Sequence, residues 1–260
     1  MSLHICILEA DDLHPSLEPR FISFGEMFKR LFYRQTQAVE FQVFNVVRGE
    51  YPKLGQHFDA YLVTGSKADS FSDEAWVVRL RDYLRGSYLR GDVLLGVCFG
   101  HQILALALGG VAERSDRGWG IGVHRYQVEY KPQWLPDEVD EFQLLISHRD
   151  QVTVLPKNAR LLARSDFCAN AAYVIGEQVL CFQGHPEFTH DFARGLMHLR
   201  QSVYCPEVYQ AACHSLACEH DGSSVARWML AFVKAAKQSR TKISDHRSSS
   251  ARNKESACTA

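Results

Sequence analysis

Apolar residues follow two alternating patterns along the first hundred positions. Short apolar runs typical of buried strands occupy residues 3–10, 41–47 and 58–65. Apolar side chains recur at helical spacing after the first and third of these runs, over residues 21–32 and 74–90. Because strands that alternate with helices form crossover units, the pattern predicts an α/β fold with a mostly parallel, twisted central sheet and helices on both faces.

The second half of the chain changes to shorter strand-like runs, which lie at residues 122–130, 151–156, 171–176 and 178–184. Helical segments follow after His190 and after Ser223, and we expect them to close the core. The pattern predicts one domain over residues 1–238. Residues 239–260 are rich in Ser, Lys and Arg and almost free of apolar side chains, so this tail is predicted to be disordered.

Composition and charge narrow the classes of partner. The chain has 260 residues, of which 46% are hydrophobic, so it can bury a substantial core. Its 29 basic and 30 acidic residues nearly cancel, which argues against nucleic acid or an acidic membrane surface as a partner. No apolar window approaches the length of a membrane span, and the eight cysteines lack the spacing of a secreted disulfide scaffold. We therefore expect a cytoplasmic protein with a small, neutral ligand.

The stretch GVCFGHQ, residues 96–102, places a cysteine between two glycines, after an apolar strand and before an apolar helix. A strand, a sharp turn at Cys98 and a helix would form a nucleophile elbow. Gly96 and Gly100 leave room for the strained turn and for close packing of strand and helix. A thiol at a helix N-terminus is favoured as thiolate, the form that attacks a carbonyl carbon. His101 lies in the same stretch and is expected to be structural.

A second stretch, QGHPEF at residues 183–188, supplies a candidate base for that thiol. Pro186 disfavours helical backbone at His185, so the run stays extended and His185 and Glu187 point the same way. Glu187 could then fix the tautomer of His185, as the third member of a nucleophile, base and orienting group.

A metal site is the alternative that the later cysteines and histidines raise. Their spacing fits no familiar zinc pattern, because the Cys and His residues interleave, whereas in such a pattern a close Cys pair precedes a close His pair; the residues are Cys205, Cys213, His214, Cys218 and His220. The chain also lacks a glycine-rich phosphate loop and a dinucleotide fingerprint. We expect neither a metal nor a cofactor.

GVCFGHQ followed by GHPEF resembles the class I, triad-type glutamine amidotransferases, and in particular the glutaminase half of GMP synthase and its stand-alone relatives. The similarity covers residues 3 to about 235, including GWGIGVH at 118–124 and SHRDQV at 147–152. It implies a flavodoxin-like fold in which Cys98 is the nucleophile, His185 the general base and acid, and Glu187 the orienting carboxylate.

The resemblance also implies a substrate site. The backbone N–H of Phe99 and one from the Gly65–Ser66 turn would form an oxyanion hole, and Gln102 would contact glutamine. Ser147 and His148 would line the pocket, with Asp150 close by. The turn reads TGSKADS, whereas many members of the family have a glycine-proline-glycine turn, and this leaves open which second N–H serves.

Three functions follow as hypotheses. A dedicated glutaminase would pass ammonia to a separate synthetase subunit, because this chain has no ATP-using domain. A γ-glutamyl peptidase would act alone on substrates larger than glutamine. A non-catalytic binding or regulatory module on the same fold is the third, but it would not need Cys98, His185 and Glu187 together.

Overall fold

A nine-stranded sheet forms the centre of the computed structural model, which describes the backbone of residues 2–257 and the side chains of residues 2–241. Its strand order is β2-β1-β3-β4-β11-β10-β9-β6-β7, and β5 and β8 pair separately. The strands are β1 Leu3–Glu9, β2 Val39–Asn45, β3 Ala60–Val63, β4 Leu94–Val97, β5 Val111–Arg114, β6 Gly120–Val128, β7 Glu141–His148, β8 Asp150–Val154, β9 Arg160–Arg164, β10 Ala172–Ile175 and β11 Val179–Phe182.

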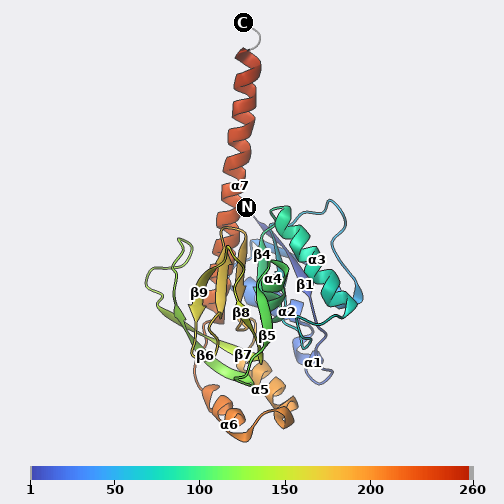
Figure 1. The fold of residues 1–260 in the computed structure, drawn as a ribbon, viewed down its shortest axis with the longest axis vertical. Coiled ribbons are helices and arrows are strands. Elements are labelled where there is room, and N and C mark those ends of the chain that lie inside the picture. The colour runs from blue at the N-terminus through green and yellow to red at the C-terminus, as the bar shows by residue number, and fades with distance from the viewer. Residues whose placement is uncertain (1, 258–260) are drawn as a thin grey trace.

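The helices surround this sheet, and α5 and α6 gather at the end of the molecule opposite the C-terminus (Figure 1). They are α1 Glu18–Phe21, α2 Phe24–Tyr33, α3 Ala75–Leu89, α4 Phe99–Ala107, α5 His190–Leu199, α6 Pro206–Ser215 and α7 Gly222–Ala257, with short 3₁₀ turns η1 Val46–Arg48 and η2 Gln201–Val203. Within the described residues, no helix is both long and apolar enough to cross a membrane.

Two hydrophobic cores lie on opposite faces of the sheet. Apolar side chains of α2 and α7, such as Phe28 and Val233, pack with Ile5 and Ile7 of β1. The other face of the sheet carries α3 and α4. Alternate residues of a strand point to opposite faces, so a strand that is apolar at nearly every position, as β1 is, must lie between two layers. The expected α/β architecture with helices on both faces is confirmed.

The parallel half of the sheet decides where the site forms. Strands β2, β1, β3, β4 and β11 run parallel, with Val97 of β4 opposite Phe182 of β11. The carboxyl ends of parallel neighbours meet at one edge of a sheet, and ligands bind there in open α/β folds. Cys98 directly follows β4 and His185 follows β11 by three residues, so the parallel pairing brings these two residues to the same edge.

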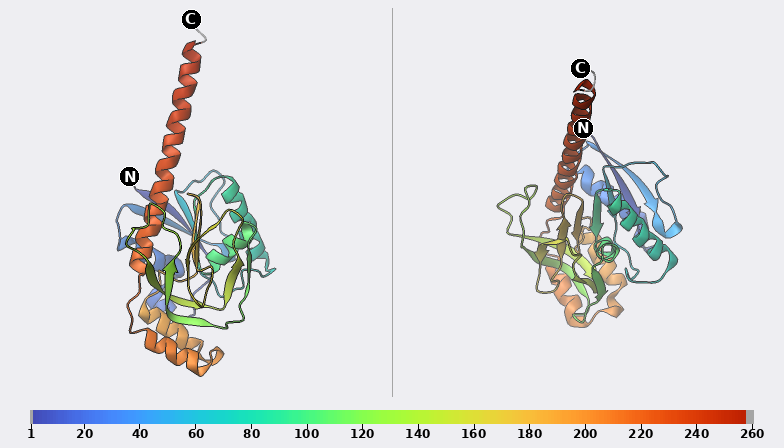
Figure 2. Two further views of the ribbon diagram at one scale, coloured as in Figure 1. Left: turned by 60° about the vertical axis from the view of Figure 1, so that its left-hand side comes forward. Right: turned by 45° about the horizontal axis from the view of Figure 1, so that its top comes forward.

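The last helix, α7, starts against the core and continues away from the domain (Figure 2). Its backbone is helical through residues 239–257, where the sequence predicts disorder. The last three residues lie outside the described part of the chain. The domain boundary at residue 238 and the disorder of the tail stay predictions.

Candidate active site

The turn at Cys98 is a strained elbow between β4 and α4. Its φ of 54° and ψ of −105° place a non-glycine residue in a sparsely populated region. A Cβ added at Gly96 would lie 2.6 Å from the Gly100 carbonyl oxygen, and one at Gly100 would lie 2.3 Å from the Val63 carbonyl oxygen. Both glycines are therefore needed for the close approach of helix and strands, as the sequence predicts.

The thiol sits at the N-cap of α4 and is almost covered, with 5% of Cys98 exposed. The Cys98 N–H donates to the Phe182 carbonyl at 2.9 Å, and its carbonyl accepts the first helical bond, from Gln102 N–H, at 3.1 Å. The N–H of Phe99, in the first turn of α4, has no intrahelical acceptor. An electrophile at the thiol would meet an unpaired N–H donor beside it.

His185 and Glu187 form a buried pair next to that thiol. His185 Nδ1 and Glu187 Oε1 are 2.8 Å apart, and the two side chains are 4% and 0% exposed. The His185 ring stacks on Phe188 at a centroid distance of 3.8 Å, and its backbone N–H donates to the Leu145 carbonyl at 2.8 Å. The extended His-Pro-Glu run points both side chains the same way, as its sequence predicts, and packing holds the ring in place.

The surroundings of His185 favour its protonated form. Burial by itself lowers the pKa of the imidazole. Electrostatic interactions and hydrogen bonds with Glu187 and Cys98 outweigh burial and raise this pKa from 6.5 to about 10. His185 therefore carries a proton at neutral pH, beside the sulfur and the carboxylate that stabilise it.

The turn after β3 approaches the same two residues. A Cβ built on Gly65 would lie 2.8 Å from His185 Cε1 and 3.7 Å from Cys98 Cβ. The Lys67 N–H is occupied, because it donates to Asp11 Oδ2 at 2.8 Å. In the described part of the chain, the N–H groups of Gly65 and Ser66 have no acceptor. These two amides, and not that of Lys67, are free to bind an oxyanion.

A cavity of about 270 Å³ opens over the thiol. Four predicted substrate residues line it together with Cys98, namely Ser66, Gln102, Ser147 and His148. The remaining predicted residues lie around the elbow: Gly65 approaches His185 and Cys98, Phe99 follows Cys98, and Glu187 contacts His185. The structure thus gathers every residue that the sequence assigns to the site.

Two polar side chains in this cavity are fixed by the backbone of Asp150. Gln102 Nε2 donates to the Asp150 carbonyl at 2.8 Å and to Gln183 Oε1 at 3.2 Å. His148 Nδ1 lies 3.1 Å from the same carbonyl. Burial lowers the pKa of His148 to about 3, so it is neutral and cannot replace His185 as a protonated partner of the thiol.

The cavity also has a wall that the sequence does not predict. This wall consists of Asp69, Trp119, Arg149, Arg200 and Val203. Arg149 lies within the SHRDQV segment, so its neighbours could have pointed to it. Arg200 and Val203 follow α5 and have no local signal, because only packing carries that segment over the elbow.

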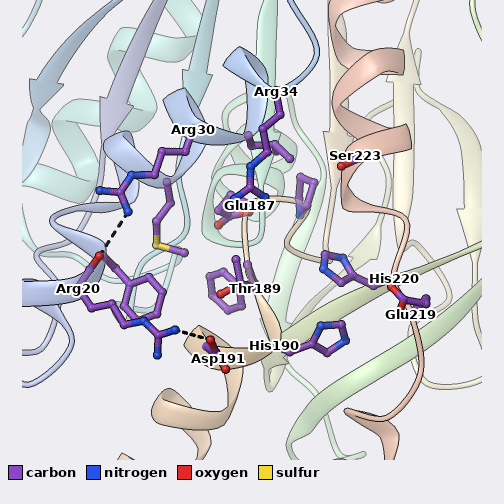
Figure 3. Close-up of a pocket in the computed structure, with 15 residues that line it drawn as sticks. Arg20, Arg30, Arg34, Glu187, Thr189, His190, Asp191, Glu219, His220 and Ser223 are labelled. Atoms are coloured by element: carbon purple, nitrogen blue, oxygen red, sulfur yellow. Dashed lines mark hydrogen bonds and ion pairs between the residues drawn. The ribbon is translucent and has the colours of Figure 1, made fainter.

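A second cavity, of about 490 Å³, is lined in part by Pro186 and Glu187 of the His-Pro-Glu run (Figure 3). Arg20 and Arg30 lie on one side of it and His190 and His220 on the other (Figure 3). Although Glu187 is among its lining residues, the Glu187 side chain is 0% exposed. The cavity therefore gives solvent no path to the carboxylate beside His185.

The other candidate groups do not form sites. Cys205, Cys213 and Cys218 are exposed, and among the side chains described no three of Cys, His, Asp and Glu gather closely enough to hold a metal ion. His101 is fully buried against Tyr173, at a ring distance of 5.0 Å, and burial lowers its pKa to about 3. This is the structural position expected for it.

Comparisons with a family model and with curated proteins point to the same family. The family model described as "Glutamine amidotransferase class-I" matches residues 25–201. A Saccharomyces cerevisiae protein named "Putative glutamine amidotransferase YLR126C" is 34% identical over 211 residues, which are 76% of this chain and 83% of the yeast protein. Gamma-glutamyl peptidase 2 of Arabidopsis thaliana is 30% identical over 160 residues, or 60% of this chain. That alignment spans 64% of the plant protein, less than two thirds of its length.

Solved structures agree on the fold. A glutamine amidotransferase from Methylobacillus flagellatus has a TM-score of 0.68 at 21% identity, covering 90% of this chain and 94% of that one. A glutamine amidotransferase from Thermotoga maritima has a TM-score of 0.66 at 18% identity, covering 90% and 96%. At these identities the likeness supports the architecture alone.

Proposed function

Because the chain belongs to the class I glutamine amidotransferase family, we propose that it hydrolyses the γ-amide bond of glutamine or a γ-glutamyl compound through a thioester on Cys98. The observation that carries this proposal is the buried His185–Glu187 pair, with its 2.8 Å contact, beside a thiol held at a strained elbow. A binding module without chemistry would gain nothing from a strained cysteine and a buried ion pair.

In the first half of the reaction, the Cys98 thiolate attacks the γ-carbonyl carbon and forms a carbon–sulfur bond. The carbonyl oxygen becomes an oxyanion, for which the Phe99 N–H and the free amides of Gly65 and Ser66 are the donors. The carbon–nitrogen bond then breaks as His185 gives its proton to the departing amine. The products are a γ-glutamyl thioester and ammonia or a peptide amine.

In the second half, His185 is neutral and acts as the base. It removes a proton from water, and the resulting hydroxide attacks the thioester carbon. The carbon–sulfur bond breaks, glutamate leaves, and the thiolate–imidazolium pair is restored. Glu187 holds His185 in one orientation through both halves, because its carboxylate accepts a hydrogen bond from Nδ1–H of both the protonated and the neutral ring.

Within this chemistry we propose a γ-glutamyl peptidase that acts without a synthetase. Plant relatives named gamma-glutamyl peptidases support it, as do the amides of Gly65 and Ser66, which are free in the chain by itself. The alternative is a glutaminase subunit that is active only with a synthetase. The similarity to the GMP synthase of Bacteroides fragilis, 28% identical over 176 residues, supports this alternative.

The test is a turnover assay of the purified chain with glutamine and a panel of γ-glutamyl dipeptides, in which released glutamate is measured. We expect ordinary turnover of dipeptides with no added protein and none with Cys98→Ser. Absence of glutamate release from every substrate, or normal turnover by Cys98→Ser, would refute the proposed chemistry. Glutamine hydrolysis that appears only with an added synthetase would restore the subunit alternative.

A further inference from the structure

The wall of the active-site cavity carries more positive charge than its carboxylates balance. Its cations are Lys67, Arg149 and Arg200, and its carboxylates are Asp69 and Asp150. Asp11, outside the cavity, pairs with Lys67 at 2.5 Å. Arg114, also outside it, bridges both cavity carboxylates, at 2.9 Å from Asp69 and 3.5 Å from Asp150. Of the two remaining arginines, Arg149 approaches Asp150 only at 3.9 Å, and Arg200 has no ion pair among the described side chains.

Neither of these arginines is hydrogen-bonded to a carboxylate. Arg149 Nε is buried without a hydrogen-bond partner, and its nearest carboxylate oxygen, on Asp150, is 3.9 Å away. Arg200 has no ion pair among the described side chains, and lies beside the Tyr204 hydroxyl. Two half-buried guanidinium groups that are not hydrogen-bonded to any carboxylate are well suited to bind the carboxylates of a substrate in this cavity.

The two arginines belong to one continuous wall. The Arg149 guanidinium lies 5.5 Å from the Trp119 ring centre, and Trp119 meets Tyr204 edge to face at 5.6 Å. Tyr204 in turn lies beside Arg200. Stacking on an aromatic face limits the freedom of a guanidinium, so less entropy is lost when a ligand binds it.

We infer that Arg149 and Arg200 bind the two carboxylates of a γ-glutamyl peptide, one on the γ-glutamyl unit and one on the leaving amino acid; this inference rests on the proposed function. Glutamine presents a single carboxylate, because its leaving group is ammonia. A γ-glutamyl dipeptide presents a second one beyond the scissile bond. The arginine pair thus recognises a feature that glutamine lacks, and selects peptides whose leaving group ends in a free carboxylate.

The experiment compares three substrates with the full chain: γ-glutamyl-glycine, its C-terminal amide γ-glutamyl-glycinamide, and glutamine. A charge-assisted hydrogen bond to the terminal carboxylate should raise kcat/KM for the acid over the amide by about 10- to 100-fold. Arg149→Gln or Arg200→Gln should bring this ratio close to one. The matched control is Arg125→Gln, since Arg125 is exposed, pairs with Glu141 and lies outside the cavity; it should keep the parent ratio.

Two results would overturn the inference: a parent protein that does not distinguish acid from amide, or arginine variants that both keep the parent ratio. Equilibrium binding of the same acid and amide to Cys98→Ser gives the comparison without turnover. If no substrate is hydrolysed but the acid still binds more tightly through Arg149 or Arg200, the proposed chemistry fails and the arginine site stands.

Discussion

Gly65→Ala tests the geometry of the site with a single methyl group. The Gly65 φ is not positive, so the backbone accepts alanine, and the free N–H of the turn is kept. The new Cβ would lie 2.8 Å from His185 Cε1, whereas two carbon atoms in contact are separated by about 3.5–4.0 Å. The ring must therefore move by about 0.7 Å or more if the turn stays in place.

His185 has little freedom to make that movement. Phe188 covers one face of the ring at 3.8 Å, and Glu187 holds Nδ1 at 2.8 Å. A displacement of about 1 Å in a reacting group can cost about 100-fold in rate, so we expect kcat to fall about 100-fold, or about 2.7 kcal/mol of barrier. Overpacking of this kind costs about 1–3 kcal/mol of stability, which leaves the protein folded.

The assay measures glutamate release and, separately, the rate at which iodoacetamide alkylates Cys98 at neutral pH. Both should fall in Gly65→Ala, because displacement of His185 weakens its pairing with the thiolate. Gly86→Ala in α3 is the matched control, because its Cβ meets only the flexible end of Arg90, at 3.3 Å. Its rates of glutamate release and of Cys98 alkylation should match those of the parent. Parent-like kcat and alkylation in Gly65→Ala would refute the proposed contact between this turn and His185.

Three further outcomes follow from the same geometry. His185→Ala should lose about as much activity as Cys98→Ala, while Glu187→Gln should lose less; a reversed order in kcat would show that another residue is the base. The free energy of unfolding should fall between about pH 6.5 and about pH 10, by at most about 1.4 kcal/mol per pH unit, because in this range His185 binds its proton in the folded state but not in the unfolded state. This contribution to stability is complete below about pH 6.5 and lost above about pH 10. Denaturant titrations would contradict it if the free energy of unfolding of Glu187→Gln fell with pH as steeply as that of the parent. Gly100→Ala should lower Tm as well as activity, because its Cβ meets the Val63 backbone at 2.3 Å, and an unchanged Tm would count against the packed elbow.

Most of the helices and strands and the reactive centre can be predicted from the amino-acid sequence. Glycines on both sides of Cys98 and a proline after His185 restrict backbone angles within a few residues, so their consequences are local and can be predicted. The same holds for the apolar runs of β1 and β3. Strands β5, β7 and β9 were not predicted, because β5 (VAER) and β9 (RLLAR) have few apolar residues and β7 alternates little between buried and exposed positions.

The surroundings of the reactive centre depend on contacts that form in the folded protein. Gly65 and His185 are separated by 120 positions in the sequence, and they meet because parallel pairing carries β3, β4 and β11 to one edge of the sheet. Arg200 reaches the cavity through the packing of the segment after α5, and its charge stays unbalanced because Asp69 and Asp150 are already paired with Arg114. Local sequence patterns determine backbone angles and which side of a helix or strand is buried. The charges that remain without partners depend on contacts between distant segments, and these contacts form only when the whole core packs.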